Sequence, residues 1–458
     1  MATPVTNLTD RPNSLFKKLE GDILIELCFS GVSLLQLLFV LIVFVVAYYL
    51  IISGKFNRST VAFTAGILIL LSKVIPDFDM KELGYLVDFN TISILIGMMI
   101  VVGTLRTTGF FEFVAVHVVR VSKGNVRALL IFFMVTIALF SAFLDNVTTI
   151  LLFAPIIFLV ADALEVSPRM FLLAGVLSAN IGGTATLIGD PPNILIGSAS
   201  GFGFMDFLRF DGPITIIALL ITVIYLDRKV FKDYRSMGDK LHRLASMDPN
   251  KAIVSKSAFY KSLAVFFGVI AGFLLHGLIG IEPSLVALAG AAAAMILNGK
   301  GFSSLSEDIE WDTIFFFMGL FVLAFALQEV GITSFISGLL GTLSGNRVVL
   351  FLTLYWLSAV MSGFIGAVPA VTFMIPVIQG ITANYGVPVE IWWVISISAC
   401  LGGSFSIAGA AANMVGVGLI EKHSKESLTY GDFLRFSMPV TIMTLVAGSA
   451  YILLRFSL

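Results

Sequence analysis

The chain has 458 residues, of which 58% are apolar and only 12% are charged, and its mean hydropathy is +1.00. This composition excludes an ordinary soluble domain, and the formal net charge of −1 gives no reason to expect nucleic-acid binding. Charge-free stretches of about twenty residues recur, for example from Gly31 to Ser53 and from Phe436 to Leu454, and each can cross a hydrocarbon core roughly 30 Å thick. The sequence therefore predicts an all-α polytopic membrane protein with about ten transmembrane helices.

The N-terminal residues 1–28 are charged and precede the first apolar run, so we expect an extramembrane segment there. Residues 29–227 then form a first membrane repeat. Within it, the stretch from Ala128 to Ala161 has Asp145 as its only charged residue, and as one helix it would be roughly 51 Å long, too long for a single crossing. A re-entrant hairpin of two half-helices, with Asp145 to Thr149 at its tip, is predicted instead.

A second irregularity follows in the same repeat. Gly182, Gly183, Gly189 and the Pro191-Pro192 pair interrupt one apolar segment and free several backbone groups from the helix ladder. Lipid does not tolerate such groups unless protein, water or a ligand satisfies them. The segment therefore predicts a discontinuous helix, and a kink used only for packing is the alternative.

Residues 228–257 form a basic linker, which the positive-inside rule places in the cytoplasm. After it, residues 258–458 repeat the first half at an offset of about 220 residues. Ser178 to Asn193 aligns without gaps with Ser398 to Asn413, and a second charge-free hairpin is predicted between Val348 and Val389. An odd number of crossings separates the repeats, so the second is inverted relative to the first.

The two breaks and the first tip supply the predicted site, because broken helices at matching places in inverted repeats mark a binding site near the bilayer midplane. The candidate ion-binding or substrate-binding residues are Ser141, Asp145, Asn146, Thr148, Thr149, Asn180, Gly182, Gly183, Thr184, Thr186, Gly189, Asp190, Asn193, Thr372, Gly402, Gly403, Ser404, Ser406 and Asn413.

Asp145 and Asp190 are the carboxylates that lie deepest in apolar sequence, and such residues usually face a cavity or pathway. An ionised Asp145 beside amide and hydroxyl oxygens suits Na⁺, with Asn146, Thr149 and Gly183 as possible further ligands; a carboxyl without water could carry a proton instead. The alternative for each aspartate is that it only caps a half-helix. No resident cofactor or structural metal is expected.

Ser141 to Pro155 and Asn180 to Asn193 together resemble the paired signatures of the ion transporter superfamily. The resemblance is greatest to the arsenite and Na⁺/H⁺ antiporter permeases (ArsB/NhaD), in the branch that includes the P protein. It implies a scaffold domain, a homodimer through that scaffold, and a transport domain that carries both hairpins and both breaks in an elevator-like movement. At the second tip, this chain has Gly366-Ala367 where relatives of the P protein tend to repeat Asp-Asn, so one cation site, in the first repeat, is expected.

Within this resemblance, a secondary transporter of a small inorganic ion is expected, by Na⁺/H⁺ antiport or by efflux of arsenite or an anion, in the cell (inner) membrane. No intramembrane Arg or Lys is evident to hold a multiply charged carboxylate, although helix N-termini could bind one, so a citrate or dicarboxylate transporter remains an alternative. An ion channel of the same fold is another. An intramembrane aspartyl protease fits poorly, because Leu144 precedes Asp145 and Leu187 replaces a motif glycine; we expect no enzyme.

Overall fold

The computed structural model describes residues 32–75, 83–229, 248–299, 301, 303, 306–424 and 427–456. Nine of the helices in these ranges are long and apolar enough to cross a membrane, and shorter apolar helices of 10–17 residues lie between them. The prediction of an all-helical polytopic membrane protein is confirmed. The segment predicted over residues 1–28 and most of the linker predicted over 228–257 lie outside the described residues.

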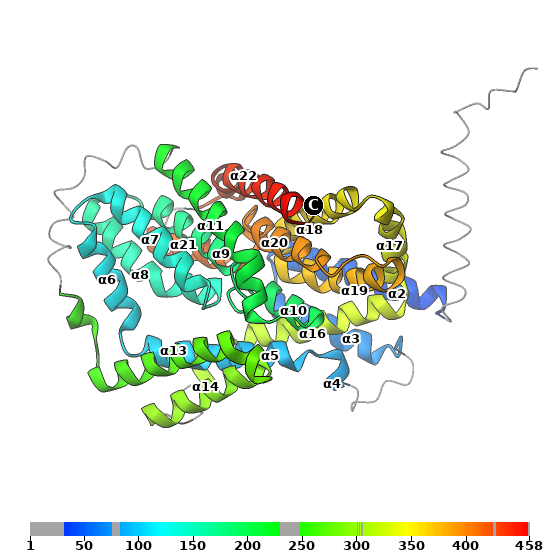
Figure 1. Ribbon diagram of the computed structural model, residues 1–458, viewed down its shortest axis with the longest axis horizontal. Coiled ribbons are helices and arrows are strands. Elements are labelled where there is room, and N and C mark those ends of the chain that lie inside the picture. The colour runs from blue at the N-terminus through cyan, green and yellow to red at the C-terminus, as the bar shows by residue number, and fades with distance from the viewer. Residues whose placement is uncertain are drawn as a thin grey trace, which may run out of the picture.

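We call one set of helices the lower group, because most of its members lie in the lower part of Figure 1. It consists of α2 (Leu34–Ser53), α3 (Arg58–Leu71), α5 (Phe89–Arg106), α13 (Lys256–Ile279), α14 (Pro283–Asn298) and α16 (Trp311–Glu329). Two glycines allow its closest crossings. A Cβ on Gly319 would lie 2.3 Å from the Ala62 carbonyl oxygen, and a Cβ on Gly97 would lie 2.8 Å from that of Ala287. Small residues let helix backbones approach in this way within membranes.

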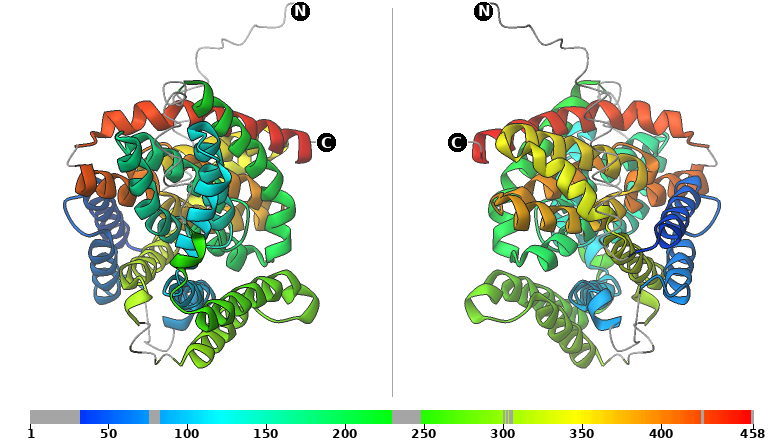
Figure 2. Two further views of the ribbon diagram at one scale, coloured as in Figure 1. Left: turned by 90° about the vertical axis from the view of Figure 1, so that its left-hand side faces the viewer. Right: turned by 90° about the vertical axis from the view of Figure 1, so that its right-hand side faces the viewer.

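A second set of helices forms the upper group, which contains the two broken segments. It consists of α7 (Val126–Ser141), α8 (Asn146–Leu164), α9 (Arg169–Gly183), α10 (Pro191–Ser200), α11 (Phe204–Lys229), α18 (Arg347–Ile365), α19 (Ala367–Tyr385), α20 (Ile391–Gly402), α21 (Ala411–Ser424) and α22 (Tyr430–Phe456). In both views of Figure 2, α13 and α14, drawn in green, lie below this group. The upper group therefore combines helices from both halves of the chain.

Connecting helices follow the same order in each half. α6 (Phe110–Val121) follows α5 and leads to α7, and α17 (Ile332–Gly341) follows α16 and leads to α18. The remaining short elements are α4 (Leu83–Leu86) and the 3₁₀ turns η3 (Pro249–Ala252), η4 (Ser306–Asp308), η5 (Thr342–Gly345) and η6 (Ile407–Gly409).

Short polar side chains set where many of these helices begin. The side chains of Asn57, Asp88, Asn125 and Asn346 each accept a hydrogen bond from a backbone N–H in the first turn of the helix that follows. These bonds satisfy donors that have no partner within the helix. Several helices end at a glycine in the left-handed region, as at Gly54 with φ 64°. Local sequence therefore determines the boundaries that position the site.

Candidate ion and substrate site

The first tip lies between α7 and α8, where Asp145 is the N-cap residue. Its side chain accepts a hydrogen bond from the Thr148 backbone N–H at 2.8 Å, and the Thr149 hydroxyl donates to the Asp145 carbonyl at 2.9 Å. The Ser141 hydroxyl donates to the Ala179 carbonyl of α9 at 2.7 Å. The tip is thus an ordered turn tied to the helix that leads into the break, and Asp145 does act as a cap.

The first break separates α9, which ends at Gly183, from α10, which begins at Pro191. The Asn193 side-chain amide donates to the carbonyl of Thr184 at 3.2 Å and to that of Thr186 at 2.9 Å, which replaces helix bonds lost in the break. Glycine is required where α9 meets the tip, because a Cβ on Gly182 would lie 2.1 Å from the Ala138 carbonyl oxygen.

The tip and the break meet through a pair of asparagines. The Asn146 amide nitrogen lies 3.2 Å from Asn180 Oδ1 and 3.3 Å from Asp190 Oδ1. Asp190 is only 5% exposed and makes no side-chain capping bond to α10. Capping is therefore the wrong explanation for Asp190, which instead faces the tip through Asn146.

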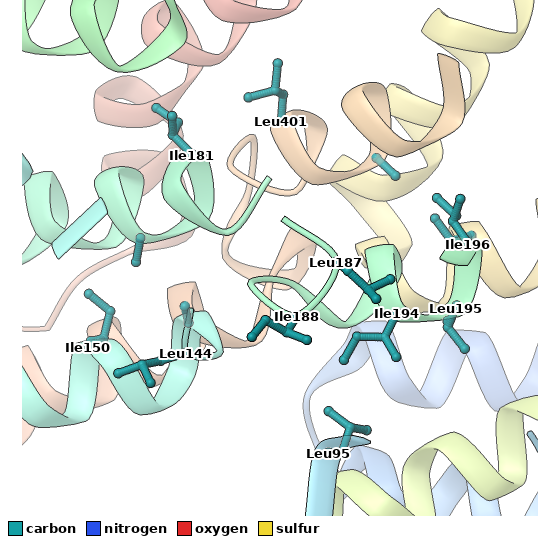
Figure 3. Packing of buried hydrophobic residues seen from close by; sticks show 14 of the residues in the cluster. Leu95, Leu144, Ile150, Ile181, Leu187, Ile188, Ile194, Leu195, Ile196 and Leu401 are labelled. Carbon is teal, nitrogen blue, oxygen red and sulfur yellow. The ribbon is translucent and has the colours of Figure 1, made fainter. Parts of the chain in front are cut away.

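Apolar side chains surround this polar contact. Figure 3 shows Leu187 and Ile188 of the break close to Ile194 of α10, with Leu144 of the first tip nearby. Leu144, Ile188 and Ile194 also line one small void together with Leu95 of α5. Apolar side chains thus pack against the polar groups of the site and lower the local dielectric constant, which strengthens electrostatic interactions there.

The second break repeats the contacts of the first. The Asn413 amide donates to the carbonyls of Gly403 at 2.8 Å and Ser406 at 2.6 Å, and the Ser406 hydroxyl donates to the Gly363 carbonyl at 2.6 Å. The corresponding bond in the first half joins the Thr186 hydroxyl to the carbonyl of Ala142.

The two breaks also contact each other. The Asn180 amide nitrogen donates to Asn413 Oδ1 at 2.8 Å and lies 3.3 Å from the Ser404 hydroxyl. Reciprocally, the Cys400 thiol lies 3.2 Å from Asn193 Oδ1. Most of the predicted site residues are therefore joined in one network.

Thr372 is the exception, because its hydroxyl donates to the Val368 carbonyl of its own helix and no described contact brings it to either break.

A cavity of about 890 Å³ opens between the two groups at this network. Asp145, Asn146 and Asp190 line it from the upper group, and Arg58 and Glu310 line it from the lower group. Arg58 therefore brings a cationic side chain to the cavity that holds the predicted site, from the end of a span and not from within one. Arg58 is the first residue of α3, and Glu310 is the N-cap residue of α16. Charged residues are common at the ends of membrane spans, so the sequence does not single these two out.

Asp211 of α11 is a further carboxylate that sequence reasoning missed. It is 0% exposed, and its Oδ2 lies 2.5 Å from the Ser396 hydroxyl, which is also 2.9 Å from Asn193 Oδ1. One signal could have found it. The sequence from Asp206 to Phe210 occurs again from Asp432 to Phe436, so that Asp211 corresponds to Ser437.

The fold and this buried polar network define a polytopic membrane transporter. A family model described as a citrate transporter, CitMHS, matches residues 48–397. The chain belongs to this family, within the ion transporter superfamily; it is a secondary transporter and not an enzyme. Whether it belongs to the arsenite and Na⁺/H⁺ antiporter branch stays a prediction.

Relatives and solved structures agree with the family. The chain is 35% identical to an uncharacterized transporter of Mycobacterium tuberculosis, over 90% of this chain and 97% of that protein. It is 27% identical to the P protein of Mus musculus, over 89% of this chain and 59% of that protein. The YdaH transporter of Alcanivorax borkumensis has a similar fold, with a TM-score of 0.57 at 15% identity over 87% of this chain and 98% of that one.

Proposed function

We propose that this protein couples transport to a cation, Na⁺ or H⁺, bound where the first tip meets the first break. The observation that carries the proposal is the position of Asn146, whose amide nitrogen joins the tip to Asp190 at 3.3 Å. Asp145, the residue before Asn146, lines the same cavity as Asp190. Two carboxylates at the wall of one cavity favour a cation, because their mutual repulsion falls when a positive charge binds between them.

Na⁺/H⁺ exchange, or exchange of another small inorganic ion against one of these cations, is the function we propose first. The second repeat offers no carboxylate at its tip or break, where Gly366 and Ala410 line the cavity in place of acidic residues. We therefore propose one coupling site per chain, in the first repeat.

Transport of a carboxylate is the second candidate. The cavity of about 890 Å³ lies within the size range of pockets that hold small organic molecules and is far larger than an inorganic ion requires. Arg58 also supplies a positive charge at its wall, and the family model bears the description of a citrate transporter.

We further propose that the two halves are inverted repeats and that the upper group moves against the lower group as an elevator. The matched bonds at the breaks support the repeat, because Ser141 and Ser362 each donate to the carbonyl of the helix that enters the break, at 2.7 and 2.5 Å. The cavity between the groups supports the movement. A homodimer through the scaffold domain, a position in the cell membrane and a cytoplasmic linker stay predictions.

The test is the lumenal pH of proteoliposomes that hold the purified protein, after an outward Na⁺ gradient is imposed. Wild type should acidify the lumen, because protons enter as Na⁺ leaves. Asp145→Asn should not, because a neutral amide can neither accept a proton nor supply a negative charge to Na⁺. Asp162→Asn is the matched control, since Asp162 lies at the exposed end of the same helix, α8, and should leave exchange intact. Equal exchange by Asp145→Asn and wild type would contradict the site, and no response from folded wild type would remove cation exchange.

A further inference from the structure

Arg58 is the only Lys or Arg among the described residues that line the large cavity. It is the first residue of α3, and Asn57 fixes the backbone there because its side chain caps the helix through the Ser59 N–H at 2.9 Å. The guanidinium carbon lies 5.2 Å from the centre of the Phe316 ring of α16. The guanidinium is thus held at the cavity wall by packing on an aromatic face, which leaves its N–H edge available.

The neighbouring carboxylates attract the Arg58 guanidinium, but they accept their hydrogen bonds from other groups. Asp312 accepts from the Ser59 hydroxyl at 2.7 Å and from the Asn57 amide at 3.2 Å, and Glu310 accepts from the Thr313 hydroxyl at 3.0 Å. Within the described ranges, no carboxylate oxygen approaches an Arg58 nitrogen within 4.0 Å. Arg58 is half-buried, and its guanidinium has five N–H donors that a ligand with anionic oxygens can use.

We propose that Arg58 is the substrate-binding residue of the lower group and that it binds an anionic oxygen group, such as a carboxylate, in a bidentate geometry. The proposal rests on the proposed function, because it takes this cavity as the path of the transported species. Arg58 belongs to the lower group while Asp145 and Asp190 belong to the upper group. The anion is therefore bound across the gap from the coupling cation.

The experiment measures uptake of radiolabelled citrate and, separately, of radiolabelled phosphate into proteoliposomes under an imposed Na⁺ or proton gradient. Arg58→Gln should raise the KM of the transported anion about tenfold or more, with a smaller change in kcat, because it removes charge-assisted hydrogen bonds. Arg58→Lys keeps the charge but loses the fork of donors, so its KM should be intermediate. The two substrates distinguish a carboxylate from an inorganic oxyanion.

Arg455→Lys is the matched control for the loss of an aromatic-stacked guanidinium. The Arg455 guanidinium carbon lies 4.7 Å from the centre of the Phe210 ring, and Arg455 does not line the cavity. The KM of the Arg455→Lys protein should therefore equal that of wild type. A single symmetric peak in size-exclusion chromatography in detergent shows that each variant is folded. An unchanged KM in folded Arg58→Gln would overturn the proposal, and so would a KM of Arg58→Lys as low as that of wild type.

Failure of wild type to transport either anion, while cation exchange persists, would overturn the role of Arg58 and leave the coupling site intact. Failure of folded wild type in both assays would overturn the role of Arg58 together with the proposed cation exchange.

Discussion

Single side chains hold the broken segments in place, and Asn193 shows how. Its amide nitrogen donates to the break, so its Oδ1 must face the other way, toward Ser396 and Cys400 of α20. The Ser396 hydroxyl also lies 2.5 Å from Asp211 Oδ2. Ser396 therefore links a buried carboxylate of α11 to the residue that closes the first break.

Removing this hydroxyl should destabilise the protein. We expect Ser396→Ala to lower the free energy of unfolding by about 1–3 kcal/mol, because it removes the one hydroxyl donor that two buried oxygens share. The measurement is the midpoint of thermal unfolding in detergent. Ser398→Ala is the control, since Ser398 is equally buried but its hydroxyl only approaches the Ile395 carbonyl of its own helix, at 3.4 Å. Equal midpoints for the two variants would contradict the linking role of Ser396.

The candidate site residues of the first half could be predicted from the sequence, whereas their hydrogen-bond partners in the second half could not. Asp145, Asn146, Asp190 and Asn193 were recognisable because polar residues in apolar sequence need a reason to be there. Ser396 was not recognisable, because a lone serine inside a helix is common and its two partners, Asn193 and Asp211, lie 203 and 185 residues away in the sequence.

Helices of the upper group approach each other closely where the glycines of the breaks lie. A Cβ on Gly182 would lie 2.1 Å from the Ala138 carbonyl oxygen, and a Cβ on Gly402 would lie 2.6 Å from that of Ala359. These are matching places in the two halves, α9 against α7 and α20 against α18. Because Gly182 and Gly402 have no side chain, the helices that lead into the breaks can pack directly against the helices that lead into the tips.

Gly182→Ala should therefore lower the yield of folded protein and the thermal midpoint, because backbone at 2.1 Å cannot give way as a flexible side chain could. Gly418→Ala in α21 is the comparison, since nothing lies within 4 Å of its added Cβ. That variant should equal or exceed wild type, because alanine favours a helix over glycine by roughly 0.5–1 kcal/mol. A Gly182→Ala protein as stable as Gly418→Ala would show that α7 and α9 can separate without cost.

Most of the element pattern was predictable from the sequence, and the exceptions have physical reasons. Long charge-free runs predicted the spans, and the Asp145 and Gly-Pro interruptions predicted where helices stop. The division of the helices into a lower and an upper group was not predictable, because the sequences of α2, α3 and α5 are apolar in the same way as those of α9 and α11. Helix assignment follows local periodicity, whereas the packing of one span against another depends on contacts between residues far apart in sequence.

At the scale of the whole molecule, the cavity separates two groups of helices, and each contributes charged residues to it. Trp311 of α16 and Met414 of α21 line it from opposite groups. Within the lower group, by contrast, the Ser284 hydroxyl of α14 donates to Asn90 of α5 at 2.5 Å. If the groups move against each other, contacts across the cavity change and contacts within a group do not.

Paired cysteines test this movement. Bridging Trp311→Cys to Met414→Cys with a bifunctional thiol reagent should arrest transport in proteoliposomes, whereas bridging Asn90→Cys to Ser284→Cys should leave it unchanged. The native Cys28 and Cys400 are present in both proteins, so they do not distinguish them. Full transport activity of the Trp311→Cys/Met414→Cys protein after complete cross-linking would contradict the elevator proposal. With a reagent that contains a disulfide, reduction of the cross-link should restore transport.

The crossed contacts between the breaks have a consequence for the order in which the protein is made. Asn193 takes donors that lie 203 and 207 residues further along the chain, and Asn180 donates to an acceptor 233 residues further on. A first half newly released into the membrane therefore contains polar backbone and amide groups whose partners have not yet been synthesised. Until the second half enters the bilayer, water, lipid headgroups or an insertion chaperone must occupy those positions, and the finished site exists only once synthesis is nearly complete.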